Sequence, residues 1–181
     1  MKKSDYDIEG MLREMRREYW QALEEGSELK AAETEEFLLF RLGGQSFALP
    51  TPLAREVLRV PKLVLVPRVD QPILGIVNLR GQVLAVTDLC PLLGLTRETE
   101  VESGRLIIVE AAGITTALAV EEVIGIRRFP VKEIEPLPPG EGGLPRHAAT
   151  GQITLEQGML VLLDLEQLLC REEIIIDQKE A

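Results

Sequence analysis

The stretch Gly75 to Leu93 reads GIVNLRGQVLAVTDLCPLL, and Gly151 to Leu169 reads GQITLEQGMLVLLDLEQLL, so the second stretch repeats the first without a gap. An internal repeat of this kind indicates that the chain builds one small structural unit twice. A second pair of segments agrees, because FLLF at residues 37–40 corresponds to LIIV at residues 106–109. The order of these four segments predicts two tandem units.

The repeated stretch also predicts its own local structure. Gly81 follows Arg80 between two apolar runs, and a glycine there allows the positive φ of a tight hairpin turn. Asp88 ends the second run, and the apolar residues after it lead to Gly94, which is the pattern of an N-cap, a short helical turn and a glycine stop. Asp164 has the same place in the second copy.

Short runs rich in Val, Ile and Leu alternate with turn residues through the rest of the chain, which is a strand pattern. Ten such strands, with no long helix between them, predict an all-β fold of antiparallel barrels or sandwiches. The predicted strands are 37–42, 46–50, 56–60, 75–79, 83–87, 105–110, 115–120, 123–129, 150–155 and 159–163.

Residues 1–33 differ from this pattern and predict a helical extension followed by a linker. Apolar residues recur at helical spacing from Ile8 to Leu23, Gly26 is a natural stop, and a polar stretch follows. The apolar stripe has three candidate uses: packing on the chain's own barrels, pairing with a second copy, or binding a partner. Packing on the barrels is the favoured use, since amphipathic helices usually cover a core.

Composition and motifs narrow the function classes. A formal net charge of -10 disfavours nucleic acid as a partner, and no apolar run is long enough to insert into a membrane or to form a signal peptide, so we expect a cytoplasmic protein. Cys90, Cys170 and the lone His147 have no metal-ligand spacing, and no P-loop, G-x-S-x-G or H-E-x-x-H motif occurs. We therefore expect no catalytic residues, no metal and no cofactor.

Three stretches, EEFLLFRLGGQSFALP, EVLRVP and GIVNLRGQVLAVTDL, together resemble the CheW family of bacterial chemotaxis coupling proteins, over about residues 37–170. The resemblance implies two tandem five-stranded barrels, each similar to an SH3 barrel, around a shared apolar seam, with a short C-terminal helix. It places a CheW-like domain at 34–175, with subdomains at about 37–95 and 104–170 that can exchange strands, and a tail at 176–181.

The resemblance also implies a function. Family members are non-enzymatic adaptors that bind the cytoplasmic tip of methyl-accepting chemoreceptors and the regulatory domain of the histidine kinase CheA, in receptor arrays near the inner membrane. One alternative is a CheW-like scaffold of another two-component array, such as one for surface motility. A less favoured alternative is a small β-barrel enzyme.

The family's partner-facing positions carry over onto single residues of this sequence. Arg80 matches the arginine of the N-L-R-G turn, which in the family is associated with an acidic residue on a neighbouring strand, and Glu56 matches that residue. An exposed arginine and glutamate can also form a surface ion pair with no further role. The partner-binding residues implied by the resemblance are Glu56, Val57, Leu58, Asn78, Leu79, Arg80 and Gly81.

Overall fold

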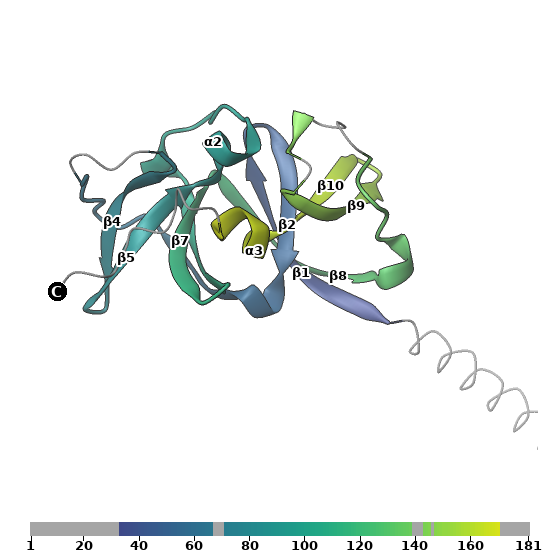
Figure 1. Cartoon of the computed structure of the whole chain (residues 1–181), viewed down its shortest axis with the longest axis horizontal. Coiled ribbons are helices and arrows are strands. Elements are labelled where there is room, and N and C mark those ends of the chain that lie inside the picture. The colour runs from purple at the N-terminus through teal and green to yellow at the C-terminus, as the bar shows by residue number, and fades with distance from the viewer. Residues whose placement is uncertain (1–32, 67–70, 139–142, 146, 171–181) are drawn as a thin grey trace, which may run out of the picture. The chain divides into compact units, whose positions relative to one another are not determined.

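The structure is a computed structural model that describes residues 33–66, 71–138, 143–145 and 147–170. Both the predicted helix at 8–23 and the predicted tail at 176–181 lie outside these residues. The predicted all-β fold is confirmed, and all ten predicted strands are present (Figure 1). They are β1 (Thr34–Leu42), β2 (Gln45–Pro50), β3 (Ala54–Arg59), β4 (Ile73–Leu79), β5 (Gln82–Asp88), β6 (Arg105–Ala111), β7 (Ile114–Val120), β8 (Glu122–Pro130), β9 (Ala149–Leu155) and β10 (Gly158–Leu163).

Short helical turns connect some of the strands. The two short α-helices are α2 (Leu89–Leu93) and α3 (Leu165–Leu169), and the 3-10 turns are η1 (Thr51–Leu53), η2 (Val101–Ser103) and η3 (Val131–Glu133). Both predicted N-caps are confirmed: Asp88 Oδ1 accepts from the Cys90 N–H at 3.0 Å, and Asp164 Oδ1 accepts from the Gln167 N–H at 3.0 Å. Gly94 ends α2 in the left-handed region, as its position predicts.

The strands form two five-stranded sheets, and each sheet combines segments from both copies of the repeat. One sheet has the order β3-β6-β7-β5-β4, and we call it the first barrel; the other has the order β8-β1-β2-β10-β9, and we call it the second barrel. The central pairs β5–β7 and β2–β10 are parallel. Because β1 and β2 lie in the second barrel while β6 and β7 lie in the first, neither barrel is a continuous half of the chain.

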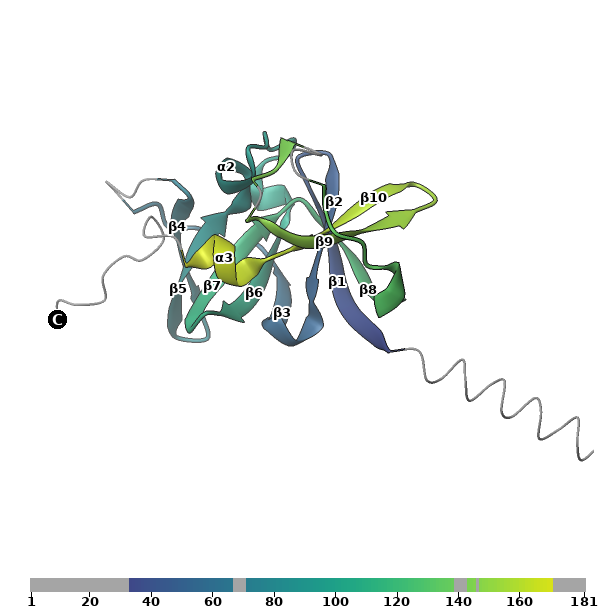
Figure 2. The ribbon, with the colours of Figure 1, turned by 45° about the vertical axis from the view of Figure 1, so that its right-hand side comes forward.

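Successive side chains of each strand point to opposite faces of the sheet, and the buried ones form three clusters. In β1, Phe40 and its alternate neighbours face the seam between the barrels, while Phe37 and Leu39 face the interior of the second barrel. The seam is the largest cluster and includes residues of both sheets and of both short helices. Figure 2 shows α3 in front of β6 and β7, where it covers the seam. The predicted shared apolar seam is therefore confirmed.

A close approach of the backbone explains the glycine that opens each copy of the repeat. A Cβ atom on Gly75 would lie 2.5 Å from the Val64 carbonyl oxygen, and one on Gly151 would lie 2.8 Å from the Glu135 carbonyl oxygen. In each case the crossing segment makes a pair of backbone hydrogen bonds with the residue after the glycine. A side chain at either position would push the crossing segment away from the barrel.

Candidate partner-binding site

The turn between β4 and β5 has a defined backbone geometry. Arg80 and Gly81 are its two central residues, with φ of +53° and +87°, which is the type I′ geometry favoured in two-residue hairpins. Nothing lies within 4 Å of a Cβ placed on Gly81, so the positive φ, not lack of space, favours glycine there. The Gly81 N–H donates to Asn78 Oδ1 at 2.8 Å and closes the turn. Arg80 is therefore held at the tip of a rigid hairpin.

An ion pair joins this turn to β3. Arg80 Nη2 donates to Glu56 Oε1 at 2.7 Å. Since β3 and β4 are the two outer strands of the first barrel's sheet, the pair spans the gap between its edges. The Arg80 side chain is 76% exposed and the Glu56 side chain 33%, and a pair this exposed typically contributes only about 0–1 kcal/mol to folding. Its main effect is to orient the guanidinium group at the surface.

The structure gives the remaining predicted site residues different surroundings. Leu58 and Leu79 are half-buried and pack against the interior of the first barrel. Val57 lies between Glu56 and Leu58 on β3, and its side chain is exposed. Leu58 and Leu79 thus support the strand and the turn from inside the barrel, while Val57 adds apolar surface outside it.

Sequence reasoning missed apolar surface near the turn. Val83 is 60% exposed and lies opposite Asn78 in the hairpin register. Val64 and Leu65 are exposed as well, and Val64 makes an isolated bridge to Ile76 on β4. The signal in the sequence is apolar residues at the outward positions of β5 and beside Pro61 and Pro67, where a solvated strand would carry polar ones. These residues enlarge the candidate site beyond the ion pair.

The groups that elsewhere serve catalysis have structural roles here. Burial, and after it the neighbouring Asp88 carboxylate, raise the pKa of the Cys90 thiol to about 12, so the thiol stays protonated at neutral pH. Asp88 itself caps α2 and pairs with Arg97 at 2.8 Å. Within the described residues no group of three His, Cys, Asp or Glu side chains has a metal-binding arrangement.

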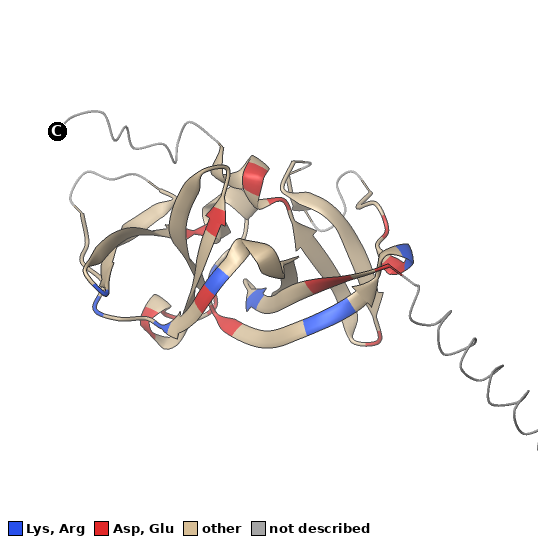
Figure 3. Ribbon diagram, turned by 90° about the horizontal axis from the view of Figure 1, so that it is seen from below, with Lys and Arg blue, Asp and Glu red and all other residues tan. Residues whose placement is uncertain are grey.

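The charged residues of the described part of the chain are mixed in sign. Seen from below, Lys and Arg positions are interspersed with Asp and Glu positions over both barrels (Figure 3). None of the helices in the described ranges is long and apolar enough to cross a membrane. The Arg80 turn, with the exposed side chains of Val57 and Val83 near it, is a candidate surface for recognition.

Comparisons with known proteins agree with this architecture. The family model of the CheW-like domain matches residues 36–173. The chain is 37% identical to the protein PilI of Pseudomonas aeruginosa over 106 residues, which cover 58% of this chain and 60% of PilI. It is 30% identical to the protein FrzA of Myxococcus xanthus over 141 residues, or 77% of this chain and 88% of FrzA.

Two further comparisons extend over most of the chain. The probable chemotaxis protein CheW of Rhizobium etli is 28% identical over 138 residues, which cover 76% of this chain and 89% of that protein. The crystal structure of the scaffolding protein TtCheW from Thermoanaerobacter tengcongensis superposes with a TM-score of 0.70 at 25% identity, and covers 78% of this chain and 96% of TtCheW. The match in structure thus includes both barrels.

Proposed function

The chain belongs to the CheW-like family of coupling scaffolds, and from this premise we propose that it is a non-enzymatic adaptor that joins methyl-accepting chemoreceptors to the histidine kinase CheA. The observation that carries the proposal is the Arg80 turn, with its ion pair to Glu56. The proposed partners are the cytoplasmic tip of the receptors and the regulatory domain of the kinase, in arrays at the inner membrane.

The geometry of the turn supports a role in binding. A guanidinium group is planar and always charged, and it binds carboxylates through paired N–H donors. The type I′ turn and the Glu56 carboxylate orient this group before a partner arrives, which lowers the conformational entropy lost on binding. Val57 and Val83 add apolar area that a partner can desolvate. A charged group beside apolar surface is a common arrangement at protein interfaces.

A second candidate function is a scaffold in a different signalling array. The similarity to PilI and to FrzA, as well as to proteins named CheW, motivates it. Both candidates use the same site, and they differ in which kinase and which receptors are bound. A β-barrel enzyme has less support, since Asp88, Asp164 and Cys90 are occupied by capping, pairing or burial.

Titration calorimetry with the two proposed partner domains tests the role of the turn. We expect the full chain to bind both the CheA regulatory domain and a receptor tip. Arg80→Glu should lower the affinity for at least one of them by about a hundredfold, since like charges at an interface cost several kcal/mol. Its unfolding free energy should change by only about 0.5 kcal/mol or less, as for other exposed sites.

Two variants control this experiment. Lys132→Glu makes the same change in net charge at an exposed position on η3, and we expect it to bind both partners as the wild type does. Glu56→Arg combined with Arg80→Glu restores an ion pair and should recover part of the affinity.

Unchanged binding of Arg80→Glu would remove the turn from the site, while a wild type that binds neither partner would refute the coupling function. ATP turnover that persists through repurification would favour the enzyme instead.

A further inference from the structure

The second barrel differs from the first at the position that corresponds to the ion pair. Residues 37–61 align with residues 106–130 without a gap, from the match of FLLF with LIIV to the match of Pro61 with Pro130. In this alignment Gly125 corresponds to Glu56. The repeat that opens at 75 and 151 places Glu156 where the first copy has Arg80. Among the described residues no ion pair joins β8 to the β9–β10 turn. The gap between the outer strands of this sheet is therefore not bridged in this way.

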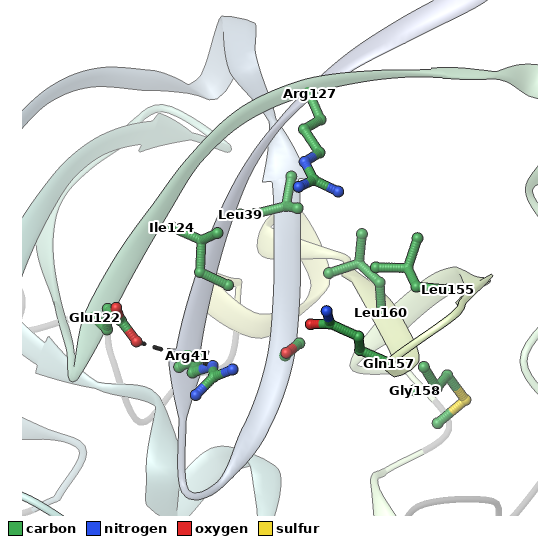
Figure 4. A pocket seen from close by; sticks show the side chains of 11 residues that line it. Leu39, Arg41, Glu122, Ile124, Arg127, Leu155, Gln157, Gly158 and Leu160 are labelled. Carbon is green, nitrogen blue, oxygen red and sulfur yellow. Dashed lines mark ion pairs between the residues drawn. The ribbon is translucent and has the colours of Figure 1, made fainter.

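A hollow with a volume of about 240 Å³ opens at this gap (Figure 4). Leu39 and Leu160 belong to the buried interior of the second barrel, and Leu155 packs against it, so the hollow leads into the barrel's own core. Charged side chains form its rim. They are Arg41 of β1 and Glu122 and Arg127 of β8.

The rim carries more positive than negative charge. Arg41 Nε lies 3.9 Å from Glu122 Oε2, and both side chains are more than half exposed, so this pair is weak. Arg127 makes no ion pair with any residue in the described ranges, and Figure 4 shows its guanidinium group beside Leu39. An apolar floor next to a guanidinium group suits an aliphatic side chain that is followed by a carboxylate.

The edge of β8 offers backbone groups to the same occupant. β8 is an outer strand of nine residues, Glu122–Pro130, and among the described strands β1 is its only neighbour in the sheet. Ile124 and Ile126 on this strand are exposed. The free N–H and C=O groups of an outer strand can pair with an added extended segment. The occupant is thus expected to be an extended peptide with aliphatic and acidic residues.

We propose that the hollow binds the C-terminal segment of the same chain, residues 172–177, which read EEIIID. Its three isoleucines are β-branched and favour an extended strand, and acidic residues stand on both sides of them to meet Arg127 and Arg41. The negatively charged segment is complementary to the positively charged rim.

The segment is long enough to reach the hollow. Leu160 lines the hollow, and β10 leads through Asp164 into α3, which ends at Leu169 with Cys170 as its C-cap. The rise per residue of the strand and of the helix limits the distance between Leu160 and Cys170 to at most about 23 Å. Seven extended residues after Cys170 span up to about 24 Å. These seven residues end at Asp177, and the three isoleucines, four to six residues after Cys170, reach up to about 20 Å from it. The acidic end of the segment can therefore reach Leu160 without any change in the barrels, with the isoleucines directly before it.

A spin label after the segment tests this placement in the full chain. Gln178→Cys with Cys170→Ser provides one accessible thiol, because Cys90 is buried. With a nitroxide attached, we expect the methyl resonances of Leu39, Leu155 and Leu160 to broaden. Arg127→Glu should restore these signals to at least about half of their diamagnetic intensity, while the matched variant Lys132→Glu should leave them broadened. Sharp resonances for all three leucines in the labelled wild type would overturn the proposal.

Two further measurements keep the result unambiguous. The first mixes spin-labelled chains that carry no isotopes with isotope-labelled chains that carry no spin label, and we expect the leucine methyl resonances to stay sharp. Broadening of these resonances in the mixture would place the segment on a second copy and overturn binding within one chain. In Ile175→Lys, the amides of Ile124 and Ile126 should exchange with solvent about tenfold faster than in the wild type. Unchanged exchange at both amides would also overturn the proposal.

Discussion

The two barrels share a strand order and a packing pattern but differ at the gap between their outer strands. In the first barrel Glu56 and Arg80 span this gap, whereas in the second the corresponding Gly125 and Glu156 leave a hollow. The shared positions are mostly buried, where close packing restricts the choice of residue. The differing positions are at the surface, where substitutions cost little stability and can change what is bound. One scaffold thus presents two different surfaces.

The two short helices show a second difference between the copies. Asp88 and Asp164 both cap a helix, but among the described residues only Asp88 has a cationic partner, Arg97, which also donates to the Ala119 carbonyl at 2.8 Å. The side chains of Asp88 and Arg97 are only 12% and 13% exposed. The same capping residue is therefore part of a buried ion pair in one copy and an ordinary cap in the other.

The largest expected effect tests whether the two barrels form one folding unit. Phe40→Ala in the seam should lower the free energy of unfolding by about 3–5 kcal/mol, because the ring is fully buried. Ile153→Val, inside the second barrel, should cost only about 0.5–1.5 kcal/mol. In both variants we expect one transition in denaturant by circular dichroism, with amides of both barrels losing protection together. Two separate transitions would show that the barrels unfold independently.

The next comparison uses the two capping residues. Asp88→Ala leaves the buried Arg97 without its carboxylate, and we expect a loss of about 3 kcal/mol in unfolding free energy. Asp164→Ala removes a helix cap and, among the described residues, no ion pair, and it should cost about 1 kcal/mol. Denaturant melts of the two variants measure both values. Equal losses would mean that the Arg97 ion pair adds nothing to the cap.

A smaller effect is expected at the glycines that open the repeat. Gly75→Ala and Gly151→Ala each place a methyl group against a backbone carbonyl, and we expect each to cost about 1–3 kcal/mol. Gly75 should be the more sensitive, since its Cβ would lie at 2.5 Å rather than 2.8 Å from the oxygen. Thermal melts of the two variants test the order, and a larger loss at Gly151 would contradict it.

The smallest effect concerns the two cysteines. Cys170 is exposed and should react readily with iodoacetamide at neutral pH, while Cys90 should react only after unfolding. Because folding raises the pKa of Cys90 from its ordinary 9.0 to about 12, the protonated thiol favours the folded state below pH 9, and this contribution is lost as the pH rises to about 12. Wild type should therefore lose more stability over that range than Cys90→Ala. Parallel pH profiles for the two proteins would refute this.

Features that depend on residues near in sequence were predictable from the sequence. The ten strands, the Gly81 turn and the two aspartate caps each rest on a few adjacent side chains, and the structure shows all of them. The family resemblance added the match of Glu56 and Arg80, which no local pattern contains, because the two residues lie on separate elements. The structure places Arg80 Nη2 2.7 Å from Glu56 Oε1.

Contacts between distant segments were decided only by the tertiary structure. Sheet register and barrel closure decide several of these contacts. They pair β2 with β10, bring Arg97 to Asp88, bury one side of Leu58 and Leu79, and open the hollow at Arg127. Local propensity is the same whichever barrel a strand joins, so the sequence pattern does not distinguish these arrangements. The choice among them depends on how well the apolar faces of distant strands pack together in one core.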